Sequence, residues 1–175
     1  LSSLGRPIEW ALIHRLHHQH SDQPEDPHSP KHQGFWRILT NTWDLSHLEA
    51  GGAVKPQLVR DLFRVKPVMF FQRHYFTVIG ASVFVLALFG GWPAVLFGYF
   101  WPVALTVLAT SVVNSVCHIG GKPCDNTLVT WLTFGEGMHG THHELPKKIN
   151  LSRGSSFDLA GFLMAAIGGR LRALS

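Results

Sequence analysis

The feature that most constrains this chain is an uncharged stretch at positions 74–121, which contains no Asp, Glu, Lys or Arg. A helix needs about 20 residues to cross the hydrocarbon core of a bilayer, so this stretch is long enough for two. The sequence GGWP at 90–93 disfavours one continuous helix, and Trp92 suits a membrane interface. A buried hairpin in a soluble protein is the alternative, which the length of the stretch disfavours. We predict a transmembrane helical hairpin at about 75–113, with arms at Tyr75–Phe89 and Ala94–Val113.

Basic residues flank the predicted hairpin on both sides, while its tip carries no charge. Positive flanks favour the cytoplasm, and a hairpin returns the chain to the side that it left. The net charge of +4 fits this topology, and no basic run is interleaved with aromatic residues as a nucleic-acid groove would require. We therefore expect an integral membrane protein with both flanks on the cytoplasmic side and no nucleic-acid partner. The flanking residues are Lys55, Arg60, Arg64, Lys66 and Arg73 before the hairpin and Lys122, Lys147, Lys148 and Arg153 after it.

The other segments predict further helices, so the expected fold class is an all-α membrane protein with one domain over 1–175. A hydrophobic content of 46% excludes a disordered or fibrous class. Cys117 and Cys124 do not form a C-x-x-C pair, and we expect them to be reduced core residues. The expected elements are a helix at Leu4–His20, a loop at Asp22–Gln33, an aromatic segment at the membrane surface at Gly34–Trp43, a basic amphipathic helix at Lys55–Phe71, a short helix capped by Asp125 or Asn126, and a helix at Phe157–Leu174.

Histidines form two clusters with the same spacing, H-x-x-H-H, in the sequences IHRLHHQHSD at 13–22 and GEGMHGTHHELP at 135–146. On a helix, residues at i, i+3 and i+4 share one face. Three glycines weaken the helix prediction for the second cluster. A further pair, Asn114 and His118, lies four residues apart where the second arm of the hairpin continues.

Imidazole binds zinc, iron, copper or nickel through a ring nitrogen. One zinc ion uses three or four ligands, and a structural site usually includes cysteine, so this many histidines suggests two metal ions. A nitrogen-rich ligand set with open positions suits iron that activates dioxygen, although zinc accepts the same ligands. The alternative is chance clustering of surface histidines or, for His118, an ordinary histidine at a helix end. The candidate ligands are His14, His17, His18, His118, His139, His142 and His143.

These motifs resemble those of a known family. The sequence HRLHHQHSDQPEDPHSP resembles the second histidine box of the membrane fatty acid desaturases, in their acyl-CoA (stearoyl-CoA-like, Δ9) branch. The sequence GEGMHGTHHELP resembles their last box, G-E-x-x-H-x-x-H-H, and NSVCH resembles their N-x-x-x-H element. The three motifs occur in the family order with a hairpin between the first and second, and the resemblance covers Pro7 to about Leu174.

The resemblance implies the C-terminal part of a fold with four transmembrane helices and a di-iron centre on the cytoplasmic side. It implies O2-dependent insertion of a cis double bond into an acyl-CoA, another acyl thioester or a lipid. The electron donor would be a b-type cytochrome, a ferredoxin or a rubredoxin. By motif, the seven histidines would be iron ligands, Asn114 would hold a metal-bound water, and Arg15, Asp22 and Glu136 would orient the ligands.

The chain also departs from the family pattern. The first box, H-x-x-x-x-H, and the first transmembrane pair are not in this sequence, so we expect an N-terminally truncated chain that is inactive by itself. Gly140 and Thr141 replace a common pair of asparagines, and Met138 replaces a residue that is usually aromatic. Two alternatives stay open, namely a hydroxylase or other oxygenase of the same superfamily and a non-catalytic membrane remnant that binds metal.

Overall fold

The computed structural model describes residues 5–41, 56–154 and 157–173. These ranges contain helices and no strand, as the predicted fold class requires. The described residues form two compact units, the first at 5–20 and 56–108 and the second at 21–41 and 109–173. Each unit carries one of the two histidine clusters.

Helix α1 (Pro7–Gln19) opens the first unit. Pro7 lies in its first turn, where the missing N–H of proline leaves no hydrogen bond unmade. The helix ends at His20, whose N–H donates to the carbonyl of Leu16. The prediction of a helix at Leu4–His20 is thus confirmed within the described residues.

The segment that follows the gap at 42–55 contains two 3-10 turns, η1 (Pro56–Val59) and η2 (Leu62–Arg64), and helix α5 (Lys66–Arg73). The predicted continuous helix at Lys55–Phe71 is therefore wrong. Val65 is extended, with φ −90° and ψ 102°, and Pro67 lies in the first turn of α5. Because proline has no N–H and clashes with the preceding turn, a helix must begin near it instead of running through it.

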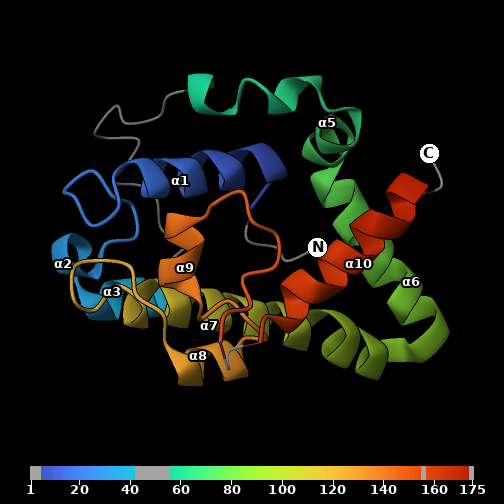
Figure 1. Cartoon of the computed structure of the whole chain (residues 1–175). Helices are drawn as coiled ribbons and strands as arrows, with labels where there is room; N and C mark the ends of the chain where they lie inside the picture. Colours follow the sequence, from blue (N-terminus) through green and yellow to red (C-terminus); the bar gives the residue numbers. More distant parts are fainter. Residues whose placement is uncertain (1–4, 42–55, 155–156, 174–175) are drawn as a thin grey trace. The chain divides into compact units, whose positions relative to one another are not determined.

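Helix α1 packs against η1 and α5 (Figure 1). The backbone N–H of Ile8 donates to Oε1 of Gln72 at 3.0 Å. The two terminal nitrogens of Arg15 donate to the two carboxylate oxygens of Asp61 at 2.6 and 3.0 Å, and Nη1 also donates to the carbonyl of Leu58. These contacts hold α1 against the segment that leads to the apolar helices.

The apolar stretch forms α6 (Tyr75–Val95), a π-helical turn η3 (Leu96–Phe100) and α7 (Trp101–Val116). Gly91 breaks the helical path with φ 62° and ψ −162°, which confirms the predicted turn at 90–93 (Figure 1). The 42 residues of Tyr75–Val116 would extend for about 63 Å as a straight helix, roughly twice the hydrocarbon core of a bilayer. Only 6% of the most apolar window is buried, so these side chains do not form a soluble core, and the segment supports membrane association.

The described residues of the second unit comprise the C-terminal part of α7 and five further helices. The predicted loop at Asp22–Gln33 is made of turns, except that its last four residues form a helix. Of the two predicted caps, the structure selects Asn126, whose Oδ1 accepts the N–H of Val129 at 3.0 Å. The helices are α2 (Pro30–Gln33), α3 (Phe35–Asn41), α8 (Thr127–Leu132), α9 (His139–Glu144) and α10 (Leu159–Ala173), the last of which confirms the predicted C-terminal helix.

A small apolar core joins the end of α7 to α8. It contains Val113, Cys117 and Val129. Cys117 is free and fully buried, and its burial raises the pKa of the thiol to about 12, so it remains protonated. Cys124 is also free and donates its N–H to the carbonyl of Cys117. This core fixes the backbone on both sides of His118.

Candidate metal centre

The first histidine cluster lies on one face of α1, as its spacing predicts. The ring centroids of His14 and His18 are 4.6 Å apart, and those of His17 and His18 are 5.7 Å apart. Trp10 stacks on His14 with a centroid distance of 4.8 Å and an interplanar angle of 15°. The indole therefore limits the orientations open to the first imidazole of the cluster.

The second cluster forms helix α9, so its H-x-x-H-H spacing is helical despite the neighbouring glycines. The ring centroids of His139 and His143 are 4.7 Å apart, and those of His142 and His143 are 6.0 Å apart. Burial lowers the pKa of His142, which favours the neutral imidazole that can ligate a metal.

Helix α9 has only six residues, too few to be stable alone in water. Asp125 supplies the missing support from outside the helix. Its Oδ1 accepts the N–H of Thr141 at 2.8 Å, and its Oδ2 accepts the hydroxyl of Thr141 at 2.6 Å. The carboxylate thus caps one of the free N–H groups in the first turn of α9. The sequence indicates Asp125 only as a possible cap for α8. No local signal links it to Thr141, which lies 16 positions away.

Two glycines allow the second cluster to lie close to the chain that precedes it. A Cβ at Gly137 would lie 2.1 Å from the backbone nitrogen of Thr130, and a Cβ at Gly140 would lie 3.0 Å from the backbone of Cys124 and Asp125. The N–H of Asn126 donates to the carbonyl of Gly137 at 2.8 Å. The glycines therefore serve backbone packing, which explains why they interleave with the histidines.

His118 lies just beyond α7 and is fully buried. Its Nδ1 is 2.7 Å from Oδ2 of Asp22, and the two side chains are 0% and 2% exposed. Because an ionised carboxylate only accepts hydrogen bonds, this contact places the ring proton on Nδ1. The lone pair of Nε2 is then available to a metal ion.

The position of Asp22 is itself fixed by its loop. The hydroxyl of Ser29 donates to Oδ1 of Asp22 at 3.3 Å, and the N–H of Asp22 donates to Oδ2 of Asp26 at 2.7 Å. Asp26 also accepts the N–H of His28 at 2.8 Å, and burial raises the pKa of its carboxyl group. Asp22 has φ 58°, a left-handed conformation that Asp and Asn tolerate better than most residues.

Three imidazole nitrogens converge in the second unit. Nε2 of His139 lies 2.9 Å from Nε2 of His118 and 3.1 Å from Nε2 of His143. The ligand atoms of the three residues all lie within 4.8 Å of one another. Three histidine nitrogens match the protein ligand count of a catalytic metal site that keeps an open position. The donor set and the tautomer of His118 therefore fit a metal ion.

The other predicted site residues occupy different surroundings. Asn114 is buried near the end of α7, four positions before His118. Glu136 is exposed as a residue, but partial burial of its carboxyl group raises its pKa, and the negative charge of Asp158 adds to that effect. Arg15 contacts Asp61 and Leu58, which lie outside both clusters.

Comparisons with a family model and with individual known proteins indicate the same family. The sequence model described as fatty acid desaturase matches residues 1–149. The chain is 38% identical over 154 residues to a probable chloroplastic lipid desaturase of Arabidopsis thaliana, covering 82% of this chain and 42% of the relative. It is 35% identical over 152 residues to an sn-1 stearoyl-lipid 9-desaturase of Anabaena variabilis, covering 82% and 54%. It is 35% identical over 155 residues to an icosanoyl-CoA 5-desaturase of Limnanthes douglasii, covering 82% and 42%. The chain thus spans about half the length of the curated relatives it matches.

Proposed function

The chain belongs to the fatty acid desaturase family, and from this we propose that the whole protein is an O2-dependent acyl desaturase that inserts a cis double bond into a fatty acyl chain. The overall reaction removes two hydrogens from the chain and, with two electrons and two protons from outside, reduces O2 to two waters. Bound iron supplies the dioxygen chemistry that an unactivated C–H bond requires. The protein residues hold the metal and fix its ligands.

We propose that iron is held by the seven histidines of the two clusters and of the N-x-x-x-H element. The convergence of the Nε2 atoms of His118, His139 and His143 is the observation that carries this proposal. The number of imidazoles favours two iron ions, because seven nitrogen ligands exceed what one ion uses. The ligands would be His14, His17, His18, His118, His139, His142 and His143.

The residues around these ligands have separate proposed roles. Asp22 holds the Nδ1 proton of His118 and so keeps Nε2 unprotonated toward the metal. Asn114 would hold a metal-bound water. Arg15 and Glu136 would orient ligands, although the contacts of Arg15 with Asp61 and Leu58 favour a more indirect effect through the position of α1.

The substrate and setting follow from the same family. We propose a Δ9-type reaction, as in the name of the stearoyl-lipid 9-desaturase relative. The acyl carrier would be CoA or a lipid, since relatives are named for both stearoyl-lipid and icosanoyl-CoA substrates. We further propose that the apolar helices cross the membrane within a fold of four transmembrane helices, with the histidines on the cytoplasmic side. Electrons would come from a b-type cytochrome, a ferredoxin or a rubredoxin.

The proposal is tested by expressing the full-length gene in a desaturase-deficient host. His143→Ala and His18→Ala should each abolish unsaturated product and lower the iron content, while the amount of protein in the membrane fraction stays unchanged. His47→Ala, a histidine outside both clusters, is the matched control and should keep full activity. Gas chromatography with mass spectrometry separates an alkene product from an alcohol, and elemental analysis counts the iron. Near-normal product from His143→Ala or His18→Ala would refute the ligand assignment, and an alcohol as main product would favour a hydroxylase.

A further inference from the structure

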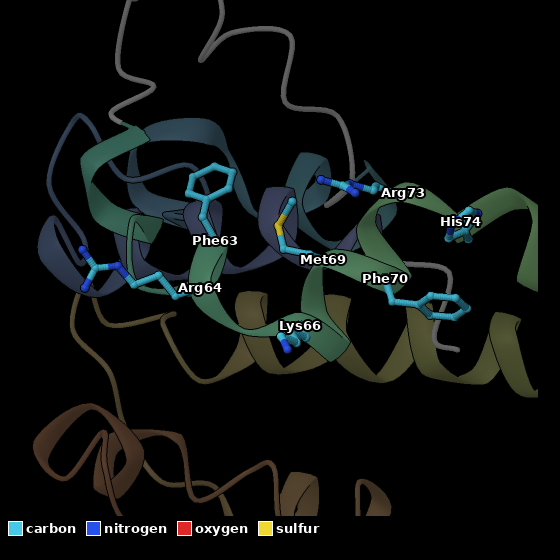
Figure 2. A pocket seen from close by; sticks show the side chains of 7 residues that line it. All are labelled: Phe63, Arg64, Lys66, Met69, Phe70, Arg73 and His74. Atoms are coloured by element: carbon cyan, nitrogen blue, oxygen red, sulfur yellow. The ribbon is translucent and has the colours of Figure 1, made fainter.

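A pocket of about 380 Å³ lies in the first unit, formed by η2, helix α5 and the residue that follows α5. Figure 2 shows its lining side chains on the 3-10 turn and on the helix. The lining combines two chemistries, namely three cations and three large apolar side chains. They are Arg64, Lys66 and Arg73, and Phe63, Met69 and Phe70.

No described carboxylate neutralises the positive charge of this pocket. In the part of the chain that the structure describes, no Asp or Glu lines it, and Arg64, Lys66 and Arg73 form no ion pair. The carboxylate of Asp61 lies nearby in sequence, but it forms a two-point contact with Arg15. Three cations that line one pocket and pair with no described carboxylate favour an anionic ligand with several acceptor oxygens, such as a phosphate group.

The pocket adjoins the start of the membrane-associated segment. Helix α5 ends at Arg73, His74 lines the pocket and caps the next helix, and Tyr75 begins α6. A pocket at this point of the chain lies at the level where lipid headgroups meet water. Phe63 and Phe70 are 50% and 53% exposed, which suits contact with the glycerol and upper acyl carbons of a lipid.

We propose that this pocket binds the headgroup of an anionic membrane phospholipid. The phosphate lies among Arg64, Lys66 and Arg73, whose side chains extend to different sides of the pocket (Figure 2), and the glycerol and first acyl carbons lie against Phe63, Met69 and Phe70. A bound lipid would fasten α5, and through it α1, to the membrane surface, because α1 packs against α5. This inference rests on the proposed membrane crossing of the apolar helices and on the charge of the pocket, but not on the proposed enzymatic activity.

The test is lipid binding by the full-length protein, purified in a mild detergent and measured by native mass spectrometry. The probes are phosphatidylglycerol and phosphatidylcholine with identical acyl chains. We expect phosphatidylglycerol to bind at least about tenfold more tightly, since each basic residue near an anionic lipid contributes about fivefold in affinity. Equal binding of the two lipids would overturn the proposal.

Three variants separate binding in this pocket from general attraction by positive charge. The triple variant Arg64→Gln, Lys66→Gln and Arg73→Gln should weaken phosphatidylglycerol binding more than tenfold. A control with the same loss of charge outside the pocket, Arg60→Gln, Lys122→Gln and Lys148→Gln, should change it less than twofold. Met69→Trp keeps every charge but fills the cavity, and should weaken binding by about fivefold or more. Equal losses in the two triple variants, or unchanged binding in Met69→Trp, would show that no such pocket site exists.

A further arm distinguishes a lipid from a free phosphate. Inorganic phosphate and glycerophosphoglycerol carry the anion without the acyl chains, so we expect neither to displace phosphatidylglycerol at equal concentration. Displacement by either one would refute the lipid assignment. None of these measurements needs iron or turnover, so their failure would leave the proposed desaturase activity untouched.

Discussion

The substitution Asp22→Asn isolates the effect of one carboxylate on the candidate metal centre. Asn has almost the same size as Asp and also tolerates the left-handed backbone of this position, where φ is 58°. The hydroxyl of Ser29 can still donate to the side-chain oxygen. The backbone N–H of residue 22 keeps its bond to Asp26. The variant should therefore fold normally and change mainly the bond to His118.

The magnitude follows from the burial of this pair. The hydrogen bond is 2.7 Å long between side chains that are 0% and 2% exposed, and a bond to a charged partner contributes about 1.5–3 kcal/mol. Loss of a group that orients a metal ligand costs about 10–100-fold in metal affinity, which is about 1.4–2.8 kcal/mol. The amide of Asn can also donate to Nδ1, which would move the ring proton of His118 to Nε2 and block ligation. We expect iron binding at least about tenfold weaker than in the wild type.

The assay is competition between the full-length protein and a coloured chelator for ferrous iron, with the metal content checked by elemental analysis. The matched control is Asp158→Asn, a buried carboxylate in the same unit that accepts the N–H groups of Leu151 and Gly161 and bonds to no histidine among the described residues. It should lower thermal stability while the iron affinity changes less than twofold. An iron affinity for Asp22→Asn within twofold of the wild type would refute the assigned role of this carboxylate.

Three further predictions concern the supports of the two units. Asp125→Ala should cost about 1 kcal/mol of stability by uncapping α9, and should lower the iron content; an unchanged iron content would contradict this. Gly137→Ala should prevent stable folding of the second unit, because the new Cβ would lie 2.1 Å from the nitrogen of Thr130, whereas native-like protease resistance would argue against that clash. Hydrogen bonding from Arg15 lowers the pKa of Asp61, so the stability from this pair is present above the unfolded pKa of about 3.9 and is lost as pH falls through the folded pKa. The melting temperature of Asp61→Asn should therefore fall less than that of the wild type between about pH 5 and 2. An equal fall in both proteins would exclude this coupling between Arg15 and Asp61.

The features that sequence predicted well are those set by neighbouring residues. The turn at 90–93 follows from two glycines and a proline, and the shared face of the first cluster follows from the period of a helix. The prediction of a continuous helix at Lys55–Phe71 is wrong, although Pro67, which interrupts it, is visible in the sequence. The basic and amphipathic pattern of this segment indicates one helix, but the missing N–H of Pro67 decides where a helix can start.

The features that sequence could not supply are contacts between distant positions. The bond between His118 and Asp22 joins residues 96 positions apart, and only the family resemblance suggested a role for Asp22. The cap of Thr141 by Asp125 leaves no pattern in the sequence, because the two residues are 16 positions apart. The glycines of the second cluster indicated a weak helix when considered alone. In the fold they permit backbone contacts that a side chain would block.

The two clusters share one spacing but depend on different supports. Helix α1 has 13 residues with proline in its first turn, and the shared face of its three histidines follows from the helix period, while contacts with η1 and α5 hold the helix in place. Helix α9 has six residues, and its placement depends on Asp125 and on the close approach at Gly137. Because helix formation is cooperative, so short a helix is lost when its external contacts are lost. The convergence of His118, His139 and His143 is therefore a property of the folded second unit, whereas the shared face of the first cluster would persist wherever α1 is helical.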